Sequence, residues 1–510
     1  MISVKVCDKF TSKTLLFDPL KTLTQNLFVS GYLSGVPICS GIGNCGQCAL
    51  IFKNNPPSPA SKDIEYFDAD QLSSGFRLGC VHYPEPNQYF QLTTKNSDRE
   101  FSFVSDSPVK SLGIDIGTTS IKWSFKHSDS SLSYGQTFNP QMGAGPEVMS
   151  RLSFAALSTQ NQDLLHKVLL SEVLNIINLQ TDFSSNICIT GNPAMIYFLL
   201  RKNLAGISVA PYSLEYTGGR HEALESYDSE VYVPSLFSPF VGADASAGLT
   251  YILEAYQPDF PFLFADFGTN GEIVLGISPD KFLCTSIALG PALEGIGLRH
   301  GSPYKKGVAS RFSPTSSGIE AIGSWTTDKI SGSGYISLLA NLIRLKNISS
   351  GGHFKEGNSP LAFKIFSEIN DKGLRIKKNL YLHPRDIEEI LKVKAAFTLG
   401  VSFLCHKGSI THDMIKSIYI GGALGEHTSL DDLETLGFFP PGSANKSEVV
   451  GNTSLKGALL MAESPSSREH NKNLAFMVKS LNLAANNEYM AESFIRHMVF
   501  EYPLLRTRSK

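Results

Sequence analysis

The sequence has no long hydrophobic run, no strong excess of charge of either sign, and no charged leader followed by an apolar core. None of its apolar runs approaches the ~18 residues that a membrane-spanning helix needs. Residues 1–6 alternate like a strand rather than a secretion signal. A formal net charge of −2 argues against a broad electrostatic surface for nucleic acid. These absences predict a cytoplasmic protein that engages neither membrane nor nucleic acid.

The chain is long enough and apolar enough to build several folded domains. Its 510 residues suggest about three domains. The apolar fraction of 42% and the charged fraction of 18% are typical of an ordered globular protein, so wholesale disorder is excluded. Because disulfides are rare in the cytoplasm, we interpret clustered cysteines as metal ligands.

Four of the eight cysteines form one pattern near the N-terminus. Cys39, Cys45 and Cys48 lie on one loop of small, turn-forming residues, and Cys80 follows after a gap. Glycines let such a loop bring backbone N–H groups to the negatively charged sulfides of a cluster. Three thiolates on one loop with a fourth from a distant strand match a [2Fe–2S] cluster. The alternative is structural zinc, although zinc sites usually pair two short C-x2-C units and Cys80 has no close partner.

The segments around these cysteines predict a small α+β domain. Strands are expected at 2–6, 14–17 and 49–52, and apolar residues recur at helical spacing over 20–33. With the cysteine pattern, residues 1–95 resemble a [2Fe–2S] ferredoxin domain of the β-grasp type. The five-residue first gap between cysteines resembles the vertebrate, adrenodoxin-type spacing more than the plant type.

Two strand–turn–strand segments of one design follow, at 111–125 and 262–276. In each, an aspartate near the strand end (Asp115 or Asp266) precedes a glycine turn. Such glycines let backbone N–H groups face phosphate, the turn side chains add donors, and each aspartate can hold Mg²⁺ directly or through water. Two such turns facing each other would grip a triphosphate, which predicts an ATP site. The matched turn residues are Gly117, Thr118 and Thr119 in the first copy and Gly268, Thr269 and Asn270 in the second.

The residues of other nucleotide-binding motifs are missing. There is no G-x4-G-K-[ST] loop, which excludes a P-loop ATPase, and no glycine-rich strand-to-helix turn with dinucleotide spacing. A third glycine turn, with Gly421, Gly422 and Gly425, either lets a flat adenine approach the backbone or serves close strand–helix packing. The turn from Ser331 to Gly334 is either another nucleotide contact or a helix start.

Together these turns resemble the actin/Hsp70/sugar-kinase ATPase superfamily, which implies an α/β ATPase with duplicated RNase H-like halves around an ATP cleft. In sugar kinases of this superfamily an aspartate shortly before the second phosphate turn acts as general base, and Asp244 occupies the matching place. An N-cap role for Asp244 is the alternative. We predict Asp244, Asp115 and Asp266 as catalytic, with Glu272 and Glu294 as weaker candidates for the base. The expected divisions are a ferredoxin domain at 1–95, a linker at 96–110, a first ATPase half at 111–250, a second half with the nucleotide cleft at 251–470, and a C-terminal segment at 471–510.

A ferredoxin domain fused to such an ATPase resembles the reductive activators of corrinoid proteins (RACo), a family of iron–sulfur ATPases. Segments 139–151, 190–195, 290–295, 296–301 and 450–457 extend the resemblance over essentially the whole chain. It implies ATP-driven electron flow from an upstream reductase through the [2Fe–2S] cluster to the Co(II) cobalamin of a corrinoid protein, which regenerates Co(I), and it implies a homodimer. The alternatives are a small-molecule kinase with an accessory cluster and a redox-sensing scaffold that binds ATP.

Two further segments carry expectations of their own. Longer family members place an added linker and a middle region before the first phosphate turn, whereas only residues 96–110 lie there in this chain. The glycine-rich and charged segment 346–380 predicts a mobile insertion. A helix is expected to begin at Pro384. Its inner side would carry Ile387, Ile390, Leu391, Ala395, Thr398 and Leu404.

Overall fold

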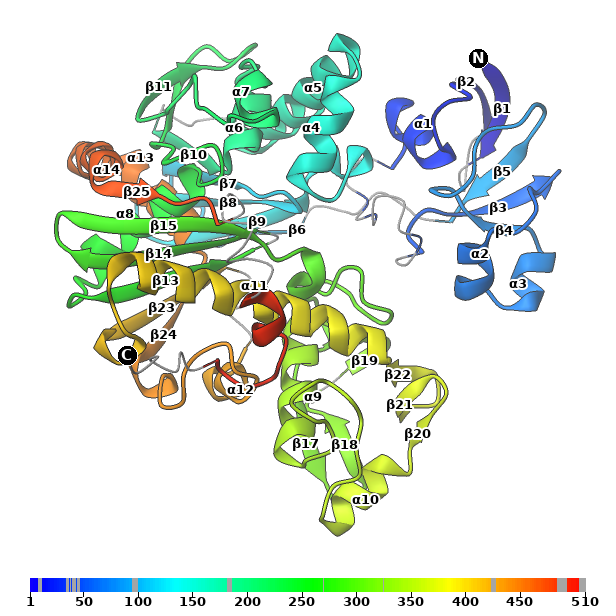
Figure 1. Ribbon diagram of the computed structural model, residues 1–510. Helices are drawn as coiled ribbons and strands as arrows, with labels where there is room; N and C mark the ends of the chain where they lie inside the picture. The colour runs from blue at the N-terminus through cyan, green and yellow to red at the C-terminus, as the bar shows by residue number, and fades with distance from the viewer. Residues whose placement is uncertain are drawn as a thin grey trace. The chain divides into compact units, whose positions relative to one another are not determined.

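The computed structural model contains two compact units, and Figure 1 labels their helices and strands. Unit 1 holds Met1–Tyr216 and Arg220–Val233, and unit 2 holds Thr217–Gly219 and Pro234–Lys510. The structure describes residues 1–7, 12–33, 36, 38, 43, 46–93, 100–180, 186–268, 270–323, 325–422, 428–483 and 493–503.

Unit 1 begins with a five-stranded sheet of order β2-β1-β5-β3-β4. The central strands β1 and β5 are parallel, and the other neighbours are antiparallel, which is the β-grasp arrangement. The strands expected near the N-terminus are present and slightly longer than predicted. The five strands are β1 (Ile2–Cys7), β2 (Ser12–Phe17), β3 (Ala49–Asn54), β4 (Phe76–Leu78) and β5 (Tyr89–Leu92).

Helix α1 (Leu23–Val29) packs on this sheet and is shorter than the predicted 20–33. It begins with a capping box, in which Thr22 Oγ1 accepts from the Gln25 N–H at 3.3 Å and Gln25 Oε1 accepts from the Thr22 N–H at 3.0 Å. Gly31 follows its C-terminus with a φ of +81°, where glycine is favoured and the helix cannot continue. Two further short helices, α2 (Ser61–Tyr66) and α3 (Ala69–Ser73), connect β3 to β4.

The second sheet of unit 1 has the order β11-β12-β10-β7-β8-β9-β6. Strands β7, β8 and β9 form an antiparallel meander, and β10 and then β12 extend it in parallel on the other side of β7. Residues 100–102, inside the expected linker, form the edge strand β6. The strands are β6 (Glu100–Ser102), β7 (Val109–Ile116), β8 (Ser120–His127), β9 (Leu132–Phe138), β10 (Ile187–Gly191), β11 (Arg220–Ala223) and β12 (Glu230–Val233).

Helical segments after β9 and β10 complete this half. Helices α4 and α5 pack on each other, and η1 and α6 both pack against α5. The helical elements are η1 (Pro140–Ala144), α4 (Val148–Ala156), α5 (Thr159–Ile177), α6 (Pro193–Leu199) and α7 (Ala205–Ser208).

The main sheet of unit 2 repeats the same design, with the order β24-β23-β13-β14-β15-β25. Strands β13, β14 and β15 form the antiparallel meander, and β23 and then β24 extend it in parallel beyond β13. The predicted duplication of an RNase H-like α/β half is confirmed. The strands are β13 (Phe262–Phe267), β14 (Asn270–Ser278), β15 (Lys281–Ala288), β23 (Ser417–Gly422), β24 (Ser447–Gly451) and β25 (Val478–Ser480).

Helices cover both faces of this sheet. Phe262 and Phe264 alternate toward α8 (Ala243–Ala255), which packs closely on α13 (Thr453–Glu463). The intervening residues of the sheet face α11 (Pro384–Gly408), the long yellow helix in Figure 1. Helix α11 begins where predicted, and the six side chains expected on its inner side are buried. Helix α14 (Pro465–Met477) follows α13 and leads into β25.

Segment 346–380 is an ordered part of unit 2, so the expectation of a mobile insertion is wrong. Ile365, Leu374 and Leu380 are buried in the same core as α11. Together with Ile348 in the same core, they fix a segment whose overall composition is charged and glycine-rich. Its elements and neighbours are β16 (Gly307–Ala309), β17 (Phe312–Thr315), β18 (Gly318–Ala321), β19 (Trp325–Ile330), α9 (Gly332–Arg344), α10 (Pro360–Phe366), β20 (Ile369–Asn370), β21 (Gly373–Lys377) and β22 (Leu380–Leu382).

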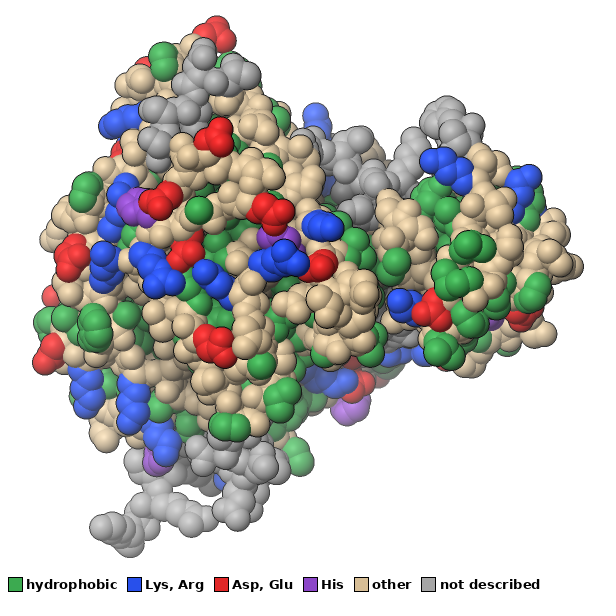
Figure 2. All heavy atoms as spheres, turned by 90° about the horizontal axis from the view of Figure 1, so that it is seen from above, with side chains coloured by type: hydrophobic (Ala, Val, Ile, Leu, Met, Phe, Trp, Pro, Cys, Tyr) green, Lys and Arg blue, Asp and Glu red, His purple; other side chains and the backbone are tan. Residues whose placement is uncertain are grey.

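The surface and the helices agree with the low charge and moderate hydropathy of the sequence. On the face shown in Figure 2, acidic and basic side chains are interspersed rather than gathered by sign. Among the helices that the structure describes, none combines the length and the apolar character that a membrane crossing requires.

Candidate functional site

Strand pairing in the β-grasp sheet brings two of the predicted cluster ligands together. Cys48 immediately precedes β3, and Cys80 is the second residue after β4. The two strands pair at Ala49 and Leu78. The Gly79 N–H donates to the Cys48 carbonyl oxygen at 2.9 Å. Both cysteines are buried, with exposed fractions of 2% for Cys48 and 8% for Cys80. The other predicted ligands, Cys39 and Cys45, lie outside the described residues.

The backbone around this pair has features suited to a cluster. Gly43 and Gly46 adopt left-handed conformations, with φ of +76° and +68°, and a side chain at Gly46 would overlap the Tyr66 ring. The Thr24 hydroxyl lies beside Gly79 and is buried without a hydrogen-bond partner in the part of the chain that the structure describes. Tight glycine turns and a spare hydroxyl donor near two buried thiols fit sulfide and thiolate acceptors.

A buried hydrogen-bonded pair, Asp63 and His82, fixes the segment that carries Cys80. The Asp63 carboxylate accepts from the Leu78 N–H and the Ala60 N–H, each at 2.8 Å, and lies 2.6 Å from His82 Nε2. Burial alone would raise the pKa of Asp63, but the hydrogen bonds from His82, Leu78 and Ala60 lower it. An ionised Asp63 therefore holds both ends of the segment around Cys80. Within the described residues no group of three or more His, Cys, Asp or Glu side chains is placed to hold a metal ion.

The first predicted phosphate turn joins β7 to β8. The Gly117 N–H donates to the Ser120 carbonyl oxygen at 2.9 Å, and a Cβ on Gly117 would lie 2.7 Å from the same oxygen. A side chain at this position would therefore force the turn open. Thr118 and Thr119 are buried, each with an exposed fraction of 5%. Asp115 lies two residues before the turn, opposite Lys122 on β8.

Side chains from β9–η1 and β10–α6 hold this turn from behind. Asn139 Nδ2 donates to the Gly117 carbonyl oxygen at 2.8 Å, and Asn192 Nδ2 donates to Thr118 Oγ1 at 3.0 Å. Thr190 Oγ1 lies 3.5 Å from Asp115 Oδ1. Both asparagines precede a proline and also cap a helix. They were not predicted as site residues, although an Asn-Pro pair after each strand was the available signal.

The second predicted phosphate turn joins β13 to β14 and is one residue shorter than the first. The Gly268 N–H donates to the Asn270 carbonyl oxygen at 3.1 Å, and the strands pair again at Phe267 and Gly271. In the first copy, pairing resumes only at Ile116 and Ile121. Thr269 lies outside the described residues. The two turns are thus related in design without being copies in detail.

Three predicted acidic residues lie together in unit 2. Glu272 is directly opposite Asp266 in the β13–β14 ladder, and it is buried with an exposed fraction of 6%. Ser286 Oγ donates to Glu272 Oε1 at 3.1 Å. Burial, and then repulsion from the carboxylates of Asp244 and Asp266, raises the pKa of Glu272 well above its ordinary value. The three carboxyl groups therefore form one acidic region of unit 2, in which Asp244 and Asp266 repel Glu272.

Asp244 occupies the first turn of α8, and the N-cap is Gly242. The alternative that Asp244 is the N-cap is therefore wrong. Its Oδ1 accepts from the Ala245 N–H at 2.8 Å, and the helix N-terminus favours its negative charge. Glu294, the other weaker candidate, ends the short helix η2 (Pro291–Glu294).

The third glycine turn begins beside Asp266. Gly421 pairs with Asp266 between β23 and β13, and a Cβ on Gly421 would lie 2.9 Å from Thr453 Oγ1. Gly422 has a φ of +84°, and a side chain there would overlap the Phe267 carbonyl oxygen. Both glycines are thus required by close packing. Adenine binding against them stays a prediction, and Gly425 lies outside the described residues.

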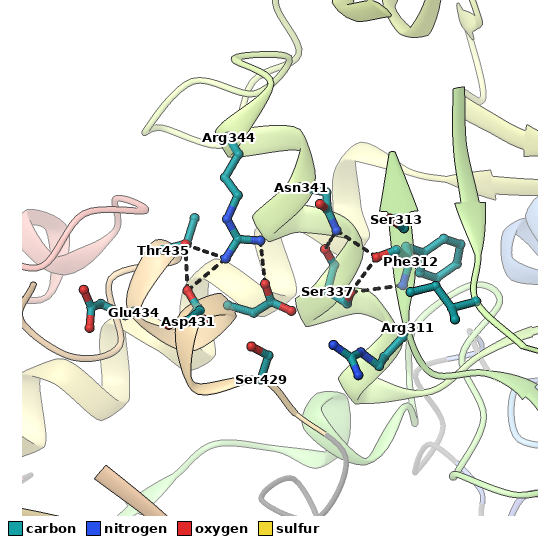
Figure 3. A pocket seen from close by; sticks show the side chains of 12 residues that line it. Arg311, Phe312, Ser313, Ser337, Asn341, Arg344, Ser429, Asp431, Glu434 and Thr435 are labelled. Atoms are coloured by element: carbon teal, nitrogen blue, oxygen red, sulfur yellow. Dashed lines mark hydrogen bonds and ion pairs between the residues drawn. The ribbon is translucent and has the colours of Figure 1, made fainter. Parts of the chain in front are cut away.

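A polar cavity of about 480 Å³ opens between α9 and α12 (Leu430–Thr435) (Figure 3). Helix α12 begins eight residues after Gly422 in the sequence. Arg344 crosses the cavity and donates to Asp432 Oδ1 at 2.6 Å and to Thr435 Oγ1 at 2.8 Å. Burial raises the pKa of Asp432 while Arg344 and Arg311 lower it. None of these residues was predicted, because they come from distant segments.

Ser331 begins the helix that lines this cavity. Its Oγ accepts from the Gly334 N–H at 3.2 Å, so it is the N-cap of α9, and its exposed fraction is 1%. Of the two interpretations of this turn, the helix start is confirmed. Farther along α9, Asn341 Nδ2 donates to the Phe312 carbonyl oxygen at 3.0 Å, which ties the helix to β17.

The fold and its matched turns define a protein of the actin/Hsp70/sugar-kinase (ASKHA) type with a β-grasp domain at its N-terminus. Two family models match in succession: the RACo middle region over residues 111–253, and the C-terminal domain of RACo, the ASKHA domain, over residues 261–504. The chain belongs to the RACo family. The expectation that the middle region is absent is wrong, because the first ATPase half is itself that region.

Two curated relatives are similar to this chain in sequence, and one solved structure shares its fold. The corrinoid activation enzyme RamQ of Eubacterium limosum is 25% identical over 386 residues, which cover 70% of this chain and 64% of RamQ. The [Co(II) methylated amine-specific corrinoid protein] reductase of Methanosarcina barkeri is 26% identical over 360 residues, covering 61% of this chain and 62% of that protein. This chain therefore spans less than two thirds of the length of either relative. A structure described as a reductive activator for corrinoid, iron–sulfur protein shares the fold, with a TM-score of 0.67 and 21% identity over 98% of both chains.

Proposed function

We propose that this protein is an ATP-dependent reductive activator, which passes an electron to the Co(II) cobalamin of a corrinoid protein and so regenerates Co(I). The observation that carries the proposal is the presence, in one chain, of two buried cysteines at one end of a β-grasp sheet and two matched phosphate-type turns in ASKHA halves. The similarity to relatives named for corrinoid activation and corrinoid-protein reduction supports it.

Cys39, Cys45, Cys48 and Cys80 would hold a [2Fe–2S] cluster. The bound cluster would supply one-electron chemistry, which zinc would not. The chain's own part is to shield the site and to position its donors. Gly43 and Gly46 allow the loop to wind closely, and the Thr24 hydroxyl offers a donor near the buried pair.

The ATPase halves would bind Mg-ATP. We assign the phosphates to the turns at Gly117–Thr119 and Gly268–Asn270, and Mg²⁺ to Asp115 and Asp266, directly or through water. Asp244 would orient and deprotonate the attacking water. Burial and repulsion from Asp244 and Asp266 raise the pKa of Glu272, which favours its neutral form beside these aspartates.

The nucleoside would occupy the cavity between α9 and α12, which follows the Gly421–Gly422 turn. Asp432 and the Thr435 hydroxyl offer acceptors for ribose or amino groups, and Arg344 offers a planar cation against which a base can stack. These polar contacts distinguish the cavity from an apolar pocket. The cavity thus adds nucleoside residues to those predicted from the sequence.

The fusion has a thermodynamic rationale. Ordinary plant-type [2Fe–2S] donors have potentials of about −400 mV, and reducing Co(II) to Co(I) requires a lower potential. ATP binding and hydrolysis would offset the uphill step by changing the complex with the corrinoid protein. An upstream reductase, a homodimer and a cytoplasmic location complete the proposal.

Anaerobic absorption spectroscopy of a Co(II) corrinoid protein tests it directly. The reconstituted chain, with a reductant and Mg-ATP, should convert Co(II) to Co(I), and omission of ATP should prevent the conversion. Phosphorylation of a small molecule without Co(I) formation would instead identify a kinase. Reversible ATP binding without hydrolysis or cobalt reduction would identify a redox-sensing scaffold.

A further inference from the structure

Arg151 in α4 is a fully buried cation with only neutral partners. Its exposed fraction is 0%. Its guanidinium donates to the Gly145 carbonyl oxygen at 2.8 Å, to Gln141 Oε1 at 3.3 Å and to Met195 Sδ at 3.5 Å, and it also donates to the Thr118 carbonyl oxygen. No carboxylate among the described residues pairs with it. All four acceptors leave its positive charge uncompensated.

Burying such a charge is costly, and a protein usually pairs it with an acid. Burial lowers the pKa of Arg151 to about 9, so the guanidinium still carries its charge near neutral pH. The exposed Arg201, by contrast, pairs with Asp163 at 2.7 Å. An uncompensated positive charge at a fixed position favours the binding of an anionic ligand.

The contact with Thr118 places this charge directly behind the first phosphate turn. Arg151 holds the Thr118 carbonyl, and Asn139 holds the Gly117 carbonyl. In a trans peptide the carbonyl and the following N–H point in opposite directions. Fixing these two carbonyls toward η1 and α4 therefore directs the N–H groups of Thr118 and Thr119 to the other side of the turn. The buried cation thus lies on the opposite side of the turn from these N–H groups.

We infer that Arg151 is a positioning residue for the nucleotide phosphates: it aims the N–H groups of the first turn and supplies the positive charge that the bound phosphates neutralise. The inference rests on the proposed function. It explains why η1 and α4 enclose an unpaired guanidinium instead of an apolar side chain of similar size.

A phosphate series separates this role from a general structural one. Arg151→Met should leave adenosine affinity unchanged and weaken ADP by about tenfold and ATP by about 100-fold, because the attraction grows with ligand charge. The measurement is calorimetric titration of the full, reconstituted chain with adenosine, Mg-ADP and Mg-ATP. Arg201→Met, which removes an exposed arginine of the same unit, serves as the matched control and should change none of the three.

Every outcome decides the inference. Equal losses for all three ligands, or no loss for ATP, would overturn it. If circular dichroism shows that Arg151→Met is unfolded, Arg151→Lys tests the inference instead, because lysine keeps the charge and loses the planar set of guanidinium N–H donors. It should weaken ATP by roughly threefold to tenfold and spare adenosine, and a uniform change would reject the role. A wild-type chain that binds none of the three ligands would reject the proposed function itself.

Discussion

Glu272 lies directly opposite Asp266 across the β13–β14 ladder, on the face of the sheet that α8 covers. Asp244, in the first turn of α8, and Asp266 both raise the pKa of Glu272. Burial is the largest cause of this shift, and the two carboxylates add to it. Asp244 and Asp266 are the candidate groups for water and for a cation.

Replacing Asp244 tests its assignment as the base. Asp244→Asn should lower ATP hydrolysis by about 10²- to 10⁴-fold, because asparagine cannot accept the proton of the attacking water. ATP affinity, measured by titration, should stay close to the wild-type value. Asp280→Asn, at the exposed β14–β15 turn, is the matched control and should hydrolyse ATP normally. Unchanged hydrolysis in Asp244→Asn would remove it from this role.

Replacing Cys80 tests the cluster ligands. Cys80→Ser should lose most bound iron and acid-labile sulfide, together with the visible absorption of the reconstituted protein, because serine replaces a thiolate ligand. Cys7→Ser, in the same domain but outside the predicted ligand set, should retain all three. Zinc without sulfide in the wild type, measured by metal analysis, would favour the structural zinc alternative.

Replacing Arg344 tests the nucleoside cavity. Arg344→Ala removes the donor to Asp432 and Thr435 and leaves Asp432 buried without its cation. We expect adenosine and ATP to weaken by the same factor, about tenfold, because the lost contacts serve the part common to both. This contrasts with the phosphate-dependent loss expected for Arg151→Met. Arg375→Ala, an exposed arginine paired with Glu368, is the control. A loss confined to ATP would argue against a nucleoside in this cavity.

Replacing Lys394 tests a buried amine that lies outside the proposed catalytic groups. Lys394 Nζ donates to the carbonyl oxygens of His497 and Glu501, at 3.2 and 2.6 Å, and so ties α11 to the C-terminal segment 493–503. Burial lowers its pKa from 10.5 to about 7. Between these values the unfolded chain binds more protons, so the free energy of unfolding should rise with pH, by at most roughly 1.4 kcal/mol per pH unit.

Lys394→Met should remove this slope, as measured by urea unfolding between pH 7 and 9.5. Lys392→Met is the control, since Lys392 lies on the same helix, is half exposed and pairs with Glu388. Parallel pH profiles for wild type and Lys394→Met would show that Lys394 keeps its charge in the folded protein.

The sequence predicted those elements whose pattern is local. In each strand–turn–strand segment an apolar strand carries an aspartate near its end and leads into a glycine turn, and α11 repeats apolar residues on one side behind a proline. Both patterns survive in the structure because each buries a face against a sheet or a core. The ordered segment 346–380 was missed, because its few buried residues are separated by charged and glycine-rich stretches.

Contacts between distant segments were beyond local patterns. Arg344 and Asp432 are 88 positions apart, and only the packing of α12 on α9 brings them together. Arg151 lies in a segment that helped to identify the family, yet nothing in its neighbours indicates that it reaches Thr118. The proximity of Glu272 to Asp266 was easier to predict from the sequence, because antiparallel pairing around a short turn places the two residues opposite each other.

Asp266 and Gly421 are partners on adjacent strands, so the acidic end of β13 and the glycine end of β23 belong to one stiff slab. A ligand that displaced the end of either strand would therefore displace the end of the other by the same amount. A conformational change driven by ATP, as proposed, must then occur elsewhere in the protein. Distance probes placed on β13 and β23 should record almost no relative movement during turnover.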